Sequence, residues 1–82
     1  MMLYENKKET YVLGQMINEL GLTKMETGKL YNCIVRNSLG LHTVEDLQDL
    51  KWEDVRKWSN MGPKTYEHFI RLQDKINERL GD

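Results

Sequence analysis

The first regular pattern in the chain is a helical repeat of apolar residues over positions 10–20. In TYVLGQMINEL the large apolar side chains recur three or four positions apart, which places them on one stripe of an amphipathic α-helix: Val12, Leu13, Met16, Ile17 and Leu20. Thr10 can cap the start of this helix, and Gly21 can end it in the left-handed conformation. The pattern therefore predicts a helix over residues 10–20.

A second helix follows, and the sequence offers two starting points for it. Thr23 and Glu26 form the T-x-x-E pattern of a capping box, whereas Thr27 could cap a start one turn later. Either start gives a buried side made of Leu30, Tyr31, Cys33 and Ile34. The pattern does not decide whether Val35 belongs to this side. The helix is expected to close between Asn37 and Gly40, with Gly40 as the glycine that follows its end.

Two short helices are predicted next. The first has Thr43 as its N-cap and Asp46 three residues later, and it turns Leu47 and Leu50 inward. The second lies in KWEDVRKW, residues 51–58, and we expect its apolar residues to face the core: Trp52, Val55 and Trp58.

The last helix begins after the turn SNMGP. Pro63 suits the first helical position, where its missing N–H is not needed. Helical spacing then continues to the C-terminus through Tyr66, Phe69, Ile70, Ile76 and Leu80. No segment shows the alternation of a strand. The fold class is therefore all-α, with five helices of unequal length and a core containing Ile34, Leu47, Val55, Trp58, Phe69 and Ile70.

Composition narrows the class of protein. A length of 82 residues is enough for one small domain. The sequence has no apolar stretch long enough for a membrane span or a secretory signal, and its single cysteine cannot form an internal disulfide. We therefore expect a cytoplasmic protein without a membrane partner. Twelve basic residues against thirteen acidic ones exclude a polybasic tail, but they leave room for a local basic patch.

The most informative stretch is WSNMGPKTYEHF, residues 58–69. Two helices joined by a short turn with glycine, the second opening on Gly-Pro-Lys-Thr, are typical of a helix-hairpin-helix. The exposed N–H groups and dipole of the second helix suit a phosphate, to which Lys64 adds a charge and Thr65 a hydroxyl. The turn alone nevertheless favours an ordinary connection between helices, in which Gly62 only permits the bend.

A larger set of motifs makes the resemblance specific. KLYNCIVR, LGLHTVEDL and NMGPKT closely resemble the C-terminal domain of the bacterial RNA polymerase α subunit. That family typically reads R-x-x-N-C-L, then G-I-x-T-V-x-E-L, then N-L-G-K/R-K/R-S. The resemblance covers residues 22–80. It implies a compact five-helix domain that binds the minor groove of A/T-rich double-stranded DNA and contacts RNA polymerase, σ or a transcription factor.

Carried over position by position, the resemblance implies a DNA-facing set of seven residues: Lys29, Asn32, Cys33, Gly62, Lys64, Thr65 and His68. Lys29 stands where the family has an arginine that enters the minor groove, and lysine lacks the planar fork of that side chain. His68 replaces a common glutamate, Pro63 a basic residue, and Val35 a frequent lysine. The acidic patch that the family turns toward σ is not found in this sequence.

The same residues have simpler interpretations. Cys33 stands beside apolar neighbours and is expected to be a packed thiol rather than a reactive one. His42 and His68 have no partner at metal-ligand spacing, so surface or turn roles are favoured for both. Carboxylates in the expected first helical turns suit the helix dipole better than a catalytic pair: Glu45, Asp46, Glu53 and Asp54. We expect no enzyme, no cofactor and no metal.

Two functions follow as hypotheses. The first is a single free-standing domain, residues 1–82, in which residues 22–80 form the DNA-binding core and residues 1–21 carry an extra N-terminal helix packed on it. The alternative is a protein-binding adaptor on the same scaffold, which would bind RNA polymerase, σ or a regulator without DNA. The adaptor is supported by the net charge of −1, the missing arginine and the extra helix.

Overall fold

The computed structural model describes residues 7–37 and 44–81, and within these ranges all regular structure is helical. It comprises α2 (Lys7–Asn18), α3 (Lys24–Asn37), the 3₁₀-helix η1 (Glu45–Asp49), α4 (Trp52–Val55) and α5 (Pro63–Gly81). The all-α class is confirmed. The described residues hold four α-helices and one 3₁₀-helix, so the third expected helix has the tighter 3₁₀ form. Gly40, His42 and Thr43 lie outside the described residues.

Helix α2 starts earlier than the apolar stripe indicates. It begins at Lys7, so Thr10 lies inside the helix and the expected cap at Thr10 is wrong. The stripe marks the buried part of a helix, and good helix formers such as lysine and glutamate extend it by a turn beyond that part. At the other end the expectation is confirmed, because Gly21 adopts the left-handed conformation with φ of 74°.

The capping box decides between the two possible starts of α3. The Glu26 N–H donates to Thr23 Oγ1 at 3.1 Å, and the Thr23 N–H donates to Glu26 Oε1 at 3.0 Å. Thr27 already lies inside the helix, where its N–H donates to the Thr23 carbonyl at 2.8 Å. Thr23 is therefore the N-cap, as the T-x-x-E pattern predicts.

Helix α4 is only one turn long, shorter than the predicted 51–58. The Lys51 N–H donates to Asp54 Oδ2 at 2.8 Å at its start, and the Trp58 N–H turns back to the Val55 carbonyl at 2.9 Å just after its end. Trp52 is 41% exposed, so its expected burial is wrong, and its ring lies on that of Tyr66 with the centroids 4.7 Å apart.

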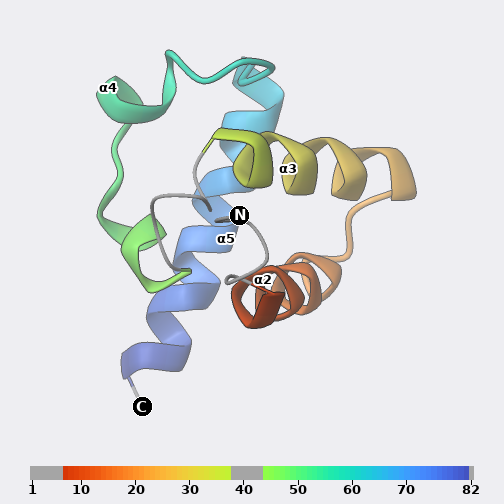
Figure 1. The fold of residues 1–82 in the computed structure, drawn as a ribbon, viewed down its shortest axis with the longest axis vertical. Coiled ribbons are helices and arrows are strands. Elements are labelled where there is room, and N and C mark those ends of the chain that lie inside the picture. The colour runs from red at the N-terminus through yellow and green to blue at the C-terminus, as the bar shows by residue number, and fades with distance from the viewer. Residues whose placement is uncertain (1–6, 38–43, 82) are drawn as a thin grey trace.

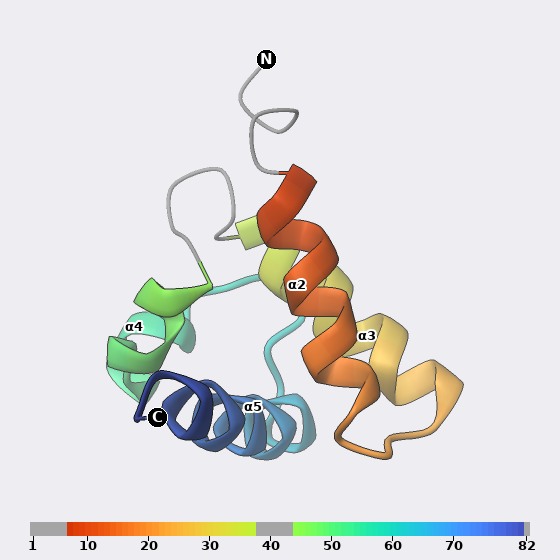
Figure 2. The same cartoon turned by 90° about the horizontal axis from the view of Figure 1, so that it is seen from below.

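The core lies between α5 and the remaining helices. In Figure 1, α5 runs the length of the molecule with α2 and α3 on one side and η1 and α4 on the other, and in Figure 2 it lies along the lower edge. The buried apolar side chains belong to every one of these elements and to the segments between them: Leu13, Met16, Ile17, Leu20, Leu30, Cys33, Ile34, Val44, Leu47, Val55, Met61, Phe69, Leu72 and Ile76.

Two further core expectations have different outcomes. Trp58 is half-buried and packs on the core with its ring edge against Phe69, at a centroid distance of 5.8 Å. Ile70 is 40% exposed, which corrects its expected place in the core. Successive helical residues are about 100° apart, so a helix that turns Phe69 and Leu72 inward carries Ile70 toward its outer flank.

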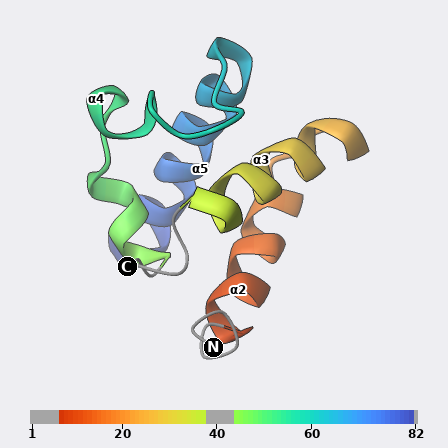
Figure 3. The same ribbon diagram turned by 45° about the horizontal axis from the view of Figure 1, so that its top comes forward.

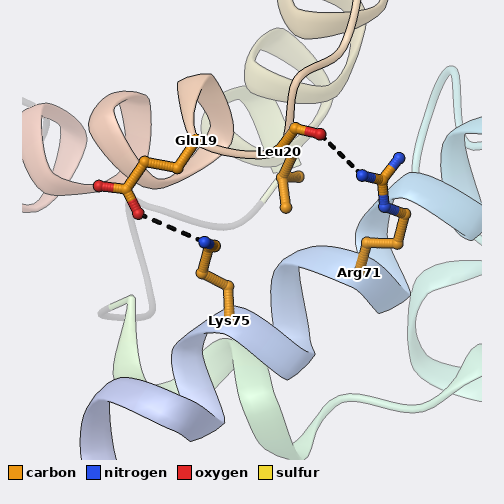
Figure 4. A network of polar contacts seen from close by, with 4 residues as sticks. All are labelled: Glu19, Leu20, Arg71 and Lys75. Atoms are coloured by element: carbon orange, nitrogen blue, oxygen red, sulfur yellow. Dashed lines mark hydrogen bonds and ion pairs between the residues drawn. The ribbon is translucent and has the colours of Figure 1, made fainter.

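The N-terminal helix packs on the body of the domain, as expected. Its apolar stripe is buried apart from Val12, which is partly buried, and two polar contacts join its end to α5 (Figure 4). Arg71 Nη2 donates to the carbonyl of Leu20 at 2.7 Å, and Lys75 Nζ lies 3.6 Å from Glu19 Oε1. The arginine satisfies a carbonyl in the turn after α2 that no helical partner reaches. None of the described helices is long and apolar enough to cross a membrane.

Candidate nucleic-acid interface

A groove opens between α3 and the turn that leads into α5. It has a volume of about 720 Å³. Its α3 wall carries Lys29, Asn32 and Cys33, and its other wall is formed by the turn and the first helical residues of α5: Trp58, Asn60, Met61, Gly62 and Thr65. Five of the seven residues implied by the resemblance therefore line one groove.

The other two residues line a smaller neighbouring cavity of about 280 Å³. Its lining is Thr23, Met25, Glu26, Lys29, Lys64, Thr65 and His68. Lys29 and Thr65 belong to both linings, so the two cavities adjoin. The structure thus brings all seven residues to one continuous surface, where the N-terminal half of α3 faces the start of α5.

The start of α5 makes this surface attractive to an anion. Pro63 is the first helical residue, as predicted, and the first helical hydrogen bond runs from the Tyr66 N–H to the Gly62 carbonyl at 2.9 Å. The N–H groups of Lys64 and Thr65 precede that bond and have no carbonyl partner within the helix. Together with the dipole of a 19-residue helix, they make this end of α5 attractive to an anion.

The ionisable side chains on this surface are two exposed lysines, one carboxylate and the imidazole of His68. Glu26 and Lys29 stand on α3 and Lys64 stands at the start of α5, and all three line the smaller cavity. The capping hydrogen bond from the Thr23 backbone lowers the pKa of Glu26, and desolvation opposes it. The side-chain hydrogen bond with Thr23 and the nearby His68 and Lys64 lower the pKa further, so that the net shift is downward. The carboxylate is therefore ionised at neutral pH and offsets part of the lysine charge.

Cys33 is a packed thiol, as its neighbours in the sequence suggest. Its side chain is buried, and its Sγ donates to the carbonyl of Ser59 at 3.5 Å. Burial raises the pKa of the thiol, while a hydrogen bond from Asn37 acts in the opposite direction. A buried thiol with a raised pKa is a poor nucleophile at neutral pH. In the groove it is part of the α3 wall.

His68 departs from its expected surface or turn role. It is only 8% exposed and lies beside Phe69 on α5. Position 68 falls on the side of α5 that carries Leu72, so the helix turns it inward and leaves it at the edge of the smaller cavity. Across residues 7–37 and 44–81, no three residues of the histidine, cysteine, aspartate and glutamate types gather closely enough to hold a metal.

Three residues of the groove are absent from the sequence-derived set. Trp58 and Met61 belong to the core and line the groove only because the turn folds back over α3. Asn60 has a left-handed backbone with φ of 69°, which asparagine tolerates better than most residues. The Ser-Asn dipeptide before Met-Gly is a signal for such a turn, but it does not tell which surface the turn completes.

This arrangement defines a class of protein: an all-helical domain with a groove beside the N-terminus of its longest described helix. A lysine stands at that N-terminus. Over residues 4–78 the sequence matches the family of the C-terminal domain of the bacterial RNA polymerase alpha subunit. The protein therefore belongs to that family. The match starts before α2, so the N-terminal helix lies inside the matched segment, whereas the motifs alone place it outside.

A relative from Guillardia theta, a DNA-directed RNA polymerase subunit alpha, is 33% identical over 78 residues. The alignment covers 95% of this chain and 22% of the relative, so the chain spans about a fifth of that protein. No solved structure matches the chain significantly.

Proposed function

We propose that this domain binds double-stranded DNA through the groove between α3 and α5, with a preference for A/T-rich minor grooves, and thereby acts in transcription. The observation that carries the proposal is the convergence of seven motif residues on two adjoining cavities at the N-terminus of α5. Membership in the polymerase α family supports the transcriptional role.

The start of α5 is the phosphate-binding part of this mechanism. The N–H groups of Lys64 and Thr65 and the helix dipole attract a backbone phosphate, and the lysine ammonium adds a full charge. Such contacts fix the position of the domain on the duplex without reading its sequence. The hydroxyl of Thr65, on the wall shared by both cavities, can donate to the same phosphate.

The opposite wall carries the part that enters the minor groove. Lys29 and Asn32 lie one helical turn apart on α3 and both line the larger cavity. A cation is drawn to the deeper negative potential of a narrow A/T minor groove, and the Asn32 amide can hydrogen-bond the acceptors on base edges there.

Gly62 supports a close approach of the DNA backbone. Its φ is not in the left-handed region, and a Cβ at this position would meet no atom within 4 Å. Neither conformation nor internal packing therefore requires a glycine here. A side chain would instead project from the wall of the groove, where it would keep a ligand away from the helix N-terminus.

The test is a titration of the folded domain with A/T-rich duplex DNA, followed by amide chemical shifts. We expect the signals of Asn32, Gly62 and Lys64 to move, and to move back as salt is added. Lys64→Glu should abolish the shifts, because it places a negative charge where the phosphate binds.

Arg79→Glu is the matched control for this charge change. Arg79 is exposed on the same helix, about 22 Å along it from Lys64 at the usual helical rise. This variant should retain most of the parent's affinity for the A/T-rich duplex. Equal loss in both variants would show that only the overall charge matters, and unshifted signals in the parent at low salt would overturn the proposal.

A protein-binding adaptor on the same scaffold is the second candidate. It is favoured by the exposure of Trp52 and Ile70, two large apolar side chains that do not line the groove. Exposed apolar surface of this kind marks contact with a protein when it is contiguous. A shift of the Trp52 indole signal on adding purified RNA polymerase or σ, without any response to DNA, would favour the adaptor.

A further inference from the structure

Asn37, the last residue of α3, makes a set of hydrogen bonds that no motif in the sequence indicates. Its amide nitrogen donates to the carbonyl of Cys33 at 2.7 Å and to the carbonyl of Ser59 at 3.2 Å. Its amide oxygen accepts from the Ser59 N–H at 3.2 Å and from the Ser59 hydroxyl at 3.3 Å. One side chain thus joins the end of α3 to the turn before α5, 22 residues away.

Cys33 completes this network. Its thiol donates to the same Ser59 carbonyl at 3.5 Å, and the Asn37 amide nitrogen lies 3.8 Å from the sulfur. Ser59 is therefore held at its N–H, its carbonyl and its hydroxyl, all by two residues of α3. In Figures 1 and 3 the connection from α4 to α5 passes close to the C-terminal half of α3, where these bonds form.

The turn needs such an anchor because few hydrogen bonds within the turn itself hold it in place. Its internal backbone bond runs from the Met61 N–H to the Trp58 carbonyl at 3.3 Å, at the long end of the range, and Asn60 between them is left-handed. The helix before it, α4, has only four residues. Short helices contribute little rigidity of their own, so contacts outside the turn decide its position.

We propose that Asn37 is a positioning residue that fixes the turn 59–62 against α3 and so sets the width of the groove between the two walls. Its relevance to DNA rests on the proposed function. Asn60, Met61 and Gly62 form one wall directly after the clamped Ser59, while Asn32 and Cys33 form the other just before Asn37. Asn37 does not line the groove itself, so it acts through these residues.

The first experiment uses the domain without DNA and measures whether the turn loosens. In Asn37→Ala, amide exchange at Ser59 and Met61 should accelerate about tenfold. The Ser59 N–H loses its acceptor, the Asn37 amide oxygen, and the Met61 N–H belongs to the turn that this loss releases. Alkylation of Cys33 by iodoacetamide should accelerate similarly, because Ser59 no longer covers the thiol. The amides of Phe69 and Leu72 on α5 should keep their exchange rates, which separates local loosening from loss of the fold.

Two variants serve as controls. Asn77→Ala removes the same side chain from an exposed position on α5 and should behave like the parent. Ser59→Ala removes only the hydroxyl bond and leaves the N–H and carbonyl of residue 59 in place. It should stay close to the parent in both exchange and alkylation, because the backbone bonds of residue 59 carry most of the clamp.

The second experiment measures affinity for A/T-rich duplex DNA. Asn37→Ala should bind several-fold more weakly than the parent, while Asn77→Ala and Ser59→Ala should bind within about twofold, since a binding constellation held loosely loses affinity without losing a direct contact. Unchanged exchange and alkylation in Asn37→Ala would overturn the clamp whatever the DNA result. A loosened turn with parental DNA affinity would overturn the positioning role. If the parent itself binds no DNA, the proposed function fails, and the exchange experiment still decides whether Asn37 fixes the turn.

Discussion

Phe69 is the residue around which the aromatic side chains of the domain gather. It is fully buried, and it contacts Trp58 edge-on at 5.8 Å and Tyr66 in a stacked arrangement at 6.4 Å between ring centroids. Such pairs add to the stabilisation that burial of the ring already provides. Because α5 carries Phe69 between the two sides of the molecule, its loss would leave a cavity that both sides share.

We therefore predict that Phe69→Ala lowers the free energy of unfolding by about 3 to 5 kcal/mol, which approaches the whole stability of a domain this small. Urea denaturation followed by circular dichroism measures the change. Tyr11→Ala, at a position 66% exposed, should change the same quantity by no more than about 0.5 kcal/mol. Similar unfolding midpoints for the parent and Phe69→Ala would contradict the described core.

At the scale of the element, the start of α3 links helix capping to pH. The reciprocal bonds between Thr23 and Glu26 hold the carboxylate in its ionised form, so its pKa is lower than the ordinary value of 4.5. A carboxyl with a lowered pKa in the fold stabilises the fold above its unfolded pKa. That contribution is lost as the pH falls through the folded-state pKa.

The prediction concerns Glu26→Gln, which keeps an acceptor for the Thr23 N–H but removes the charge. The variant should be less stable than the parent at about pH 7. The difference should shrink once the pH falls below the ordinary carboxyl pKa of 4.5 and vanish below the lowered pKa of Glu26 in the folded protein. Urea denaturation at several pH values measures it. Glu67→Gln, at an exposed position on α5, is the matched control. A difference that persists unchanged into acid would show that the ionised cap is not its source.

The elements that the sequence predicts well are those with a local chemical signal at an end. Thr23 with Glu26 fixes the start of α3, Pro63 the start of α5, and Gly21 the left-handed turn after α2. The start of α2 carries no such signal, and the apolar stripe alone places it too late. The helical spacing of Trp52, Val55 and Trp58 overestimates the length of α4, because the backbone turns back after Val55.

The candidate site likewise has a part that the sequence predicts and a part that it does not. Its seven residues can be chosen from the sequence because they stand in motifs of known order, and the structure brings them to one surface. The clamp between Asn37 and Ser59 cannot be chosen in this way, since no motif pairs the two residues and their contact depends on how the backbone folds back. Burial of His68 likewise depends on which face of α5 meets α3.

At the scale of the whole molecule, a nearly neutral protein carries two lysines and a helix N-terminus on the surface where function is proposed. The net charge is −1, yet Lys29 on α3 and Lys64 on α5 both line the smaller cavity at the positive end of the α5 dipole. Two lysines and one helix end can contact only a few phosphates of a DNA duplex, so binding releases few counterions. The logarithm of the DNA affinity should therefore fall with the logarithm of salt at a slope of about −2 to −3. Affinities measured at several salt concentrations give this slope.

The most direct test of the central claim, that this groove binds A/T-rich DNA, is the affinity of the parent and Lys29→Arg for A/T-rich and G/C-rich duplexes at low salt. Arginine is less strongly hydrated than lysine and is favoured in narrow A/T minor grooves. The account predicts weak binding by the parent. It also predicts a gain of about threefold or more for Lys29→Arg on the A/T-rich duplex, with a smaller gain on the G/C-rich one. No binding by either protein to either duplex would contradict it.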